Sequence, residues 1–261
     1  MNLTITHIDT ACMLIDINGY RIMTDPTLDK AGNLYHHGLG VFSSKTGNPA
    51  LEHTDLSHVD LVLLSHHQHK DNFDIKGQEF AAKVPLIITT RPAAEVLSNA
   101  VGLDNWESYR IDTPKLTNLK ITATPAQHRP SWIPEFVSGK VIGFVIEADE
   151  FTNGVLYISG DTVYFKGIDE VAKRYKVDVA VFHLGSVQIR YLTAFAQYTM
   201  NAKGLLKSVK VLDPNTIIPI HYKGWTHFKE PERVLRLTVY KNPLLKRKTI
   251  FLTPGEPTRI R

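Results

Sequence analysis

The sequence predicts an α+β protein in which two stacked β-sheets carry helices on their outer faces. The first part of the chain alternates short apolar runs with turns, as antiparallel meanders do. The later part interleaves short apolar runs with segments of helical spacing. Meanders followed by interleaved strands and helices favour stacked sheets over a single doubly wound sheet. Because 43% of the 261 residues are hydrophobic, we expect one domain with a full core over residues 1–261.

Three strands are predicted at the start of the chain, at residues 3–8, 12–17 and 20–24. Asn18-Gly19 is a strong signal for a two-residue hairpin between the last two. Asp25-Pro26 ends the third strand. Residues 26–58 are rich in glycine and show no period. Loops of this length in compact domains are usually functional or disordered, so we predict a flap loop beside the functional site.

The remaining elements follow from apolar runs and from helical spacing. We predict strands at residues 61–64, 86–90, 119–124, 141–148, 155–159, 179–183, 216–220 and 249–252. We predict helices at residues 74–83, from Pro92 to about residue 100, and at residues 166–176, 202–212 and 232–240. The run at residues 61–64 is almost fully apolar, which is typical of a strand covered on both faces.

Composition excludes several classes of function. The formal net charge is only +4, and no long basic stripe interleaved with aromatic residues is present, which argues against a nucleic-acid binder. No apolar run is long enough to span a membrane, and the start lacks a signal-peptide pattern. The single cysteine, Cys12, excludes an intrachain disulfide. We therefore expect a soluble, cytoplasmic protein, with homo-oligomer formation left open.

The strongest functional signal lies at residues 65–72, Ser-His-His-Gln-His-Lys-Asp-Asn. Imidazole nitrogens and carboxylate oxygens are the usual ligands of zinc and similar divalent ions. If the segment continues the preceding strand, alternate side chains share a face, and His67, His69 and Asp71 converge. Spacing to Asp71 favours His67, whereas the strand-end phrase Ser65-His66 favours His66 as the alternative. Adjacent strand residues point to opposite faces, so we expect only one of the two to bind the ion.

Further side chains of ligand type stand where a predicted strand gives way to a loop. His128 follows the run at residues 121–126, Asp161 follows residues 156–160, and His221 follows residues 217–220. Sites on stacked sheets form at one end from the loops after several strands. We therefore expect these side chains to gather beside the histidine-rich segment.

In the histidine-rich segment and around His128, Asp161 and His221, the chain resembles the metallo-β-lactamase-fold hydrolases. The resemblance extends over nearly its whole length. The leading motif of that family, His-x-His-x-Asp-His, is similar to residues 67–72. The phrases Pro-Ala-Gln-His, Ser-Gly-Asp-Thr and Ile-Pro-Ile-His-Tyr look closest to the ascorbate-6-phosphate lactonase-like branch. The resemblance implies a four-layer αββα sandwich of two mixed sheets. It also implies hydrolysis of a small-molecule ester, lactone or amide by a metal-bound hydroxide.

The resemblance also implies a set of ligands for one or two divalent ions. The first ion would be held by His67, His69 and His128, and the second by Asp71 and His221, with Asp161 bridging both. Zinc is the expected ion, with manganese and iron as alternatives.

Asp71 and Asp161 are the expected catalytic residues, and Asp71 could orient the nucleophile or accept its proton. Asn72 stands where the family usually has a second-site histidine. Because a neutral amide is a weaker ligand than imidazole, the second site is expected to be weak, empty or filled by an oxygen-preferring ion.

Four residues are candidates for substrate contacts: His183, Arg129, Trp225 and His227. His183 has an equal alternative, which is a hydrogen bond to a metal-ligating carboxylate. Two alternative functions remain open. One is a phosphodiesterase or nuclease on the same fold, and the other is a metal-binding homologue without turnover.

Overall fold

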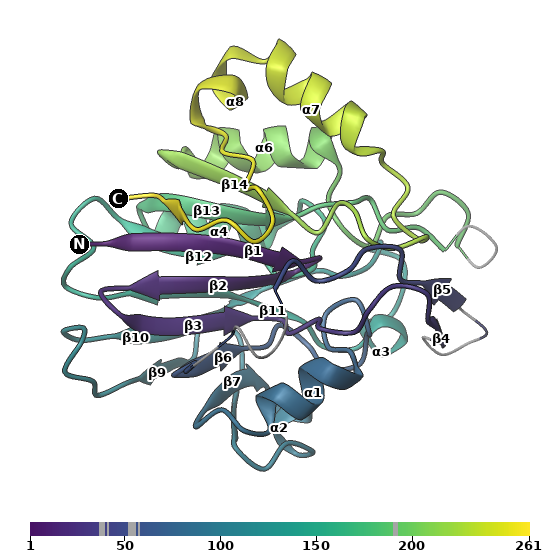
Figure 1. Cartoon of the computed structure of the whole chain (residues 1–261). Coiled ribbons are helices and arrows are strands. Elements are labelled where there is room, and N and C mark those ends of the chain that lie inside the picture. Colours follow the sequence, from purple (N-terminus) through teal and green to yellow (C-terminus); the bar gives the residue numbers. More distant parts are fainter. Residues whose placement is uncertain (37–39, 41, 52–55, 57, 190–192) are drawn as a thin grey trace.

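Two mixed β-sheets stack face to face in the computed structural model, which describes residues 1–36, 40, 42–51, 56, 58–189 and 193–261 (Figure 1). The seven-stranded sheet has the order β15 (Thr258–Arg259), β1 (Leu3–Asp9), β2 (Cys12–Ile17), β3 (Tyr20–Thr24), β6 (Leu61–Leu63), β7 (Ile87–Thr90) and β8 (Ala100–Leu103). The six-stranded sheet has the order β14 (Thr216–Ile220), β13 (Val177–His183), β12 (Val155–Ile158), β11 (Ile142–Glu147), β10 (Lys120–Pro125) and β9 (Ser108–Arg110).

The main apolar core lies between the two sheets. Ile15 and Leu63 of the first sheet share this core with Ile121 and Val181 of the second, and all four are fully buried. Burial of such side chains contributes about 1.5–3 kcal/mol each, so the inward faces hold the sheets together.

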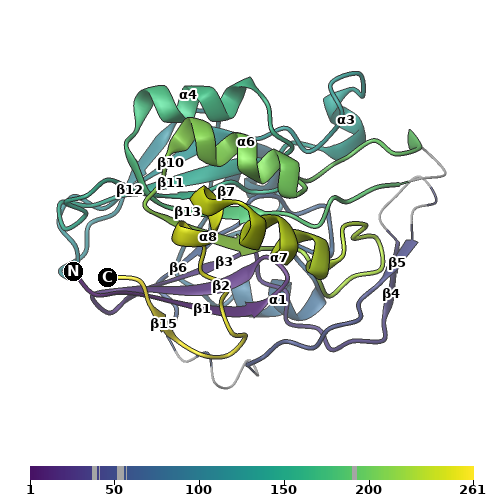
Figure 2. The same ribbon diagram turned by 90° about the horizontal axis from the view of Figure 1, so that it is seen from above.

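Helices cover the outer face of each sheet (Figures 1 and 2). The six-stranded sheet carries α4 (Lys166–Arg174), α6 (Ala202–Leu212), α7 (Glu232–Lys241) and α8 (Pro243–Lys248). On the other side, α1 (Ile75–Ala81) packs on the seven-stranded sheet and α2 (Arg91–Ala94) lies beside β8. The predicted αββα sandwich is thus confirmed. No helix in the described part of the chain is long and apolar enough to cross a membrane.

The structure corrects several predicted elements. The helix expected from Pro92 to about residue 100 is the single turn α2, and β8 follows it. The strand expected at residues 249–252 is reduced to one bridge between Thr249 and Ile217, and β15 instead pairs with the edge of β1. The prediction also missed β9, α8 and the short α3 (Glu135–Ser138).

The described part of the predicted flap loop contains a hairpin and a buried anchor. Strands β4 (Leu34–His36) and β5 (Phe42–Ser44) pair on the side of the molecule opposite the chain termini (Figures 1 and 2). Residues 37–39, 41, 52–55 and 57 of this loop lie outside the described residues. Nζ of Lys45 lies 2.7 Å from Oδ2 of Asp9 and 3.0 Å from Oδ2 of Asp74, with the Lys45 side chain fully buried. This anchor connects the loop to the end of β1 and the start of α1.

Candidate metal centre

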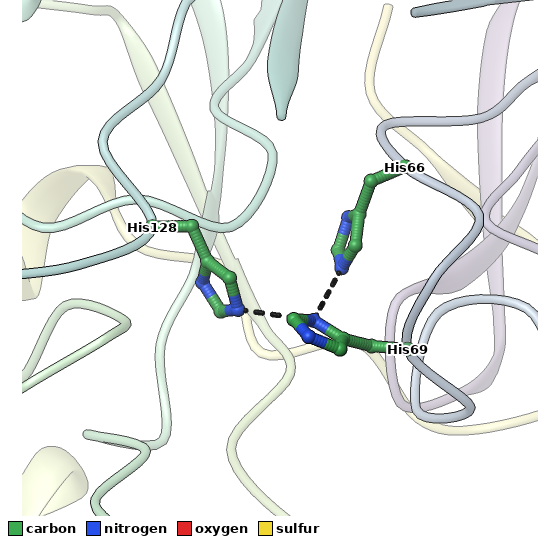
Figure 3. A group of neighbouring side chains, drawn as sticks. All are labelled: His66, His69 and His128. Atoms are coloured by element: carbon green, nitrogen blue, oxygen red, sulfur yellow. Dashed lines mark hydrogen bonds between the residues drawn. The ribbon is translucent and has the colours of Figure 1, made fainter. Parts of the chain in front are cut away.

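Three imidazole rings converge from two separate segments (Figure 3). Nδ1 of His69 lies 3.0 Å from Nε2 of His66 and 3.2 Å from Nε2 of His128. A tetrahedral site with metal–nitrogen bonds of about 2.0–2.1 Å separates its ligand atoms by about 3.3 Å. The three nitrogens therefore have the spacing of ligands around one ion.

The histidine that joins this group is His66, the alternative to His67 in the expected set. His67 is half-buried and lies outside both groups of possible ligands found among the described residues. The expectation for His67 assumed that the strand continues into the motif. Instead β6 ends at Leu63, and the backbone bends at residues 65, 67 and 68. Strict alternation of faces requires extended backbone, so it does not reach these histidines.

A second group consists of Asp71, Asp161 and His221, all three buried. Nε2 of His221 lies 3.5 Å from Oδ2 of Asp71 and 3.7 Å from Oδ1 of Asp161. Oδ2 of Asp161 and Nε2 of His221 are buried without a hydrogen bond to any described residue. Unpaired buried polar atoms are costly, so these atoms, aimed at one place, fit a bound cation.

The electrostatics of the second group also favour a cation. Burial alone would raise the pKa of Asp71, but His227 and His221 outweigh burial and hold it well below its usual range. The pKa of Asp161 is lowered in the same way, against burial, by His221 and His183. Burial would lower the pKa of His221, but Asp161 and Asp71 raise it to about 9. Two ionised carboxylates thus draw positive charge to this point.

The first group has the opposite electrostatic character. Burial lowers the pKa of His66 and of His128, so both rings are neutral at neutral pH. Ligation requires a neutral imidazole with a free lone pair. The first group is therefore ready to bind a divalent ion without first releasing a proton from these two rings.

Hydrogen bonds to backbone carbonyls orient two of the rings. Nδ1 of His128 lies 3.0 Å from the carbonyl oxygen of Tyr198, and Nδ1 of His221 lies 3.3 Å from that of Leu184. A carbonyl only accepts, so each Nδ1 carries a proton, and in the neutral ring Nε2 then keeps its lone pair for an ion; at His221 the ion would take the place of the Nε2 proton. The third ring, His183, contacts a carboxylate in place of a carbonyl, since its Nδ1 lies 2.9 Å from Oδ1 of Asp161.

Local backbone geometry places Asp161 and His221. Gly160 precedes Asp161 with φ of 59°, and a Cβ at Gly160 would lie 2.4 Å from the carbonyl oxygen of Ile142. Only glycine fits such a close approach with positive φ. His221 also has a positive φ of 58°, and its backbone N–H donates to Thr10 at 3.0 Å. Strained backbone of this kind is concentrated at functional sites.

Of the four substrate candidates, His227 and His183 contact the second group directly. Nε2 of His227 lies 2.8 Å from Oδ2 of Asp71, and the ring of His183 stacks on that of His221 with 5.5 Å between centroids. Trp225 is buried, and its indole N–H donates to Thr10. Arg129 donates to the backbone carbonyl of Ile133 at 2.8 Å.

The structure also brings Asp25 to the site, which the sequence prediction missed. Asp25 is buried, and its Oδ1 accepts the backbone N–H of Ser65 at 2.7 Å. In the sequence, Asp25-Pro26 indicates only the end of a strand. The available signal is that a carboxylate follows a buried strand there, as it does at Asp161.

Comparison with known proteins agrees with this geometry. A family model described as the beta-lactamase superfamily domain matches residues 20–222. A UPF0173 metal-dependent hydrolase of Caldivirga maquilingensis is 26% identical over 249 residues, covering 94% of this chain and 93% of that protein. Another, from Pelotomaculum thermopropionicum, is 29% identical over 220 residues, covering 81% and 87%.

Two solved structures share the fold over nearly the whole of both chains. The structure of a possible metal-dependent hydrolase from Veillonella parvula has a TM-score of 0.84 at 18% identity and covers 100% of each chain. That of isothiocyanate hydrolase from Delia radicum gut bacteria has a TM-score of 0.80 at 22% identity and covers 98% of each. The family match extends over most of the chain and includes every residue of both ligand groups, so the chain belongs to the beta-lactamase superfamily domain family.

Proposed function

We propose that this protein is a metal-dependent hydrolase that cleaves a small-molecule ester, lactone or amide. The observation that carries the proposal is a pair of adjacent groups after the ends of strands. One group has three imidazoles, and the other has two carboxylates and a further imidazole; all are buried except the half-buried His69. The names of its relatives as metal-dependent hydrolases support metal-dependent hydrolysis. The phrases shared with the ascorbate-6-phosphate lactonase-like branch make a lactone the first bond to test.

In this proposal His66, His69 and His128 hold the first ion, and Asp71, Asp161 and His221 hold the second. Divalent ions held by these residues would lower the pKa of water toward neutrality and would polarise the bond to be cleaved.

The surrounding residues keep the ligands in position. His227 orients Asp71 through its 2.8 Å contact. His183 holds Asp161 at Oδ1, and Oδ2, which has no hydrogen bond to a described residue, would be available to an ion. Zinc suits the imidazole group, whereas the carboxylate-rich group also suits manganese or iron. Asn72 remains a candidate for a weak ligand of the second ion.

The proposal is tested with protein purified without chelator. Metal analysis should find at least one tightly bound divalent ion per chain, and the protein should hydrolyse a member of a panel of lactones, esters, amides and an isothiocyanate. A phosphodiester and single-stranded nucleic acid complete the panel. Chelation should abolish turnover, and returning the ion should restore it.

His69→Ala is the matched inactive variant and should lose both metal and turnover, whereas replacing the exposed His58 by Ala should change neither. A protein that takes up no divalent ion, even on reloading, would contradict the proposal. Turnover of the phosphodiester alone would move the protein to the phosphodiesterase class.

A further inference from the structure

Ser65 lies at the centre of a buried hydrogen-bond group behind His66. Its backbone N–H donates to Oδ1 of Asp25 at 2.7 Å, and its Oγ lies 2.9 Å from Nδ1 of His66. The amide nitrogen of Asn72 donates to the same Oγ at 3.5 Å. Ser65, His66 and Asn72 are fully buried, and Asp25 is 1% exposed. Solvent therefore does not compete for these contacts.

The chemistry of an ion on His66 fixes the direction of each hydrogen bond. When Nε2 of His66 gives its lone pair to an ion, Nδ1 must carry the proton and donate to Oγ of Ser65. A hydroxyl has one hydrogen and two acceptor lone pairs. The Ser65 hydroxyl then accepts from His66 and Asn72, so its own hydrogen must go to another acceptor.

Asp25 is the acceptor that completes this group. Burial raises the pKa of Asp25 well above its usual range, and hydrogen bonds from the backbone and the side chain of Ser65 offset only part of that rise. The positive charge of an ion on the far side of His66 also favours the carboxylate form, which only accepts hydrogen bonds.

We propose that Asp25, Ser65 and Asn72 act as positioning residues that fix the tautomer and the orientation of His66 for the first ion. The inference rests on the metal site of the proposed function. In the usual arrangement a carboxylate contacts the ligating imidazole directly. Here the hydroxyl of Ser65 lies between the carboxylate of Asp25 and the imidazole of His66. The same arrangement also gives Asn72 a role in the first site, through Ser65, in addition to any contact with the second ion.

Asp25→Asn is the most informative variant, because the asparagine side chain has nearly the same shape as aspartate and only the direction of the hydrogen bonds changes. The amide oxygen can still accept the backbone N–H of Ser65, while the amide NH₂ donates to the Ser65 hydroxyl. The hydroxyl hydrogen must then turn to Nδ1 of His66, which places the ring proton on Nε2, the ligand atom. Ser65→Ala removes the connection, and Ser65→Thr restores a hydroxyl.

The experiment measures zinc affinity by competition with a chromophoric chelator, and the visible spectrum of the cobalt-loaded protein. Asp25→Asn and Ser65→Ala should each weaken the first ion about 10–100-fold, the usual effect of residues behind a ligand. Both should alter the cobalt spectrum, and Ser65→Thr should recover most of the affinity. Asn72→Ala should cause a smaller loss, because its contact is long.

Two variants at buried positions outside the site serve as controls. Ser208→Ala removes a hydroxyl that donates within α6, and Asp178→Asn changes a carboxylate paired with Arg261. Both should keep the wild-type affinity and cobalt spectrum. Unfolding of each chelated variant separates a loss of fold from a loss of affinity.

The two proposals fail in different ways. Wild-type protein that binds no ion would overturn the proposed function and this inference together. Wild-type protein that binds an ion, with folded Asp25→Asn and Ser65→Ala variants of equal affinity and spectrum, would overturn only the positioning role. If Asp25→Asn does not fold, Ser65→Ala compared with Ser65→Thr decides the outcome alone.

Discussion

At the scale of single residues, two neighbouring histidines provide the most direct contrast. His66 is fully buried and contacts His69, whereas the half-buried His67 lies outside both ligand groups. We expect His66→Ala to weaken binding of the first ion by at least about tenfold, because even residues that only contact ligands cost 10–100-fold. His67→Ala should stay close to wild type. Metal content per chain after dialysis against a weak chelator measures the difference.

The two variants control for each other, since each removes one imidazole from the same bend. Equal metal loss in both, with both proteins folded by circular dichroism, would contradict the assignment. The sequence could not decide between them, because the decision depends on where β6 ends and how the chain bends after Leu63. His69, His128, Asp161 and His221 were predictable, because each belongs to a motif or follows a strand.

At the scale of elements, the buried Lys45 connects the hairpin loop to the rest of the fold. Its ammonium group lies between Asp9 and Asp74 with no solvent exposure. Removing one partner of a buried ion pair leaves an uncompensated charge and costs about 3–5 kcal/mol. We expect Lys45→Met to lower the free energy of unfolding by that amount, as measured by urea denaturation.

The exposed Lys83 provides the matched control for this prediction. Lys83→Met should change the free energy of unfolding by no more than about 0.5 kcal/mol, as surface substitutions usually do. Similar stability of the Lys45→Met and Lys83→Met proteins would show that the anchor contributes little.

The elements also show what local sequence can and cannot predict. The meander β1–β3 was predictable because its apolar runs and the turn at Asn18-Gly19 are local signals. By contrast, β15 consists of two residues, Thr258 and Arg259, and exists only because the edge of β1 is available to pair with it. The strands β4 and β5 are similarly short, and the anchor at Lys45 depends on partners far away in the chain.

At the scale of the whole molecule, the proposed ligands come from both sheets. His66, His69 and Asp71 follow β6 of the seven-stranded sheet. His128, Asp161 and His221 follow β10, β12 and β14 of the six-stranded sheet. Bound ions would therefore join the two layers at one edge of the sandwich.

We therefore expect chelation to lower the thermal stability of the protein. Free ion at 1,000 times its dissociation constant stabilises the folded state by about 4 kcal/mol, which shifts the Tm of a chain of this size by on the order of 10 °C. Thermal unfolding with and without chelator measures the shift. His69→Ala should unfold at nearly the same temperature in both conditions. An unchanged wild-type Tm, in protein shown to lose its ion, would contradict this role of the site.

The order of the ligands along the chain has a consequence for synthesis. Chains leave the ribosome N-terminus first, and their early parts begin to fold before later parts exist. The first three proposed ligands are complete at Asp71, but the last arrives only with His221, after all six strands of the six-stranded sheet have been made. A chain that stops before His221 thus offers an incomplete set, and tight capture of the full complement of ions would mark a chain that has completed the six-stranded sheet.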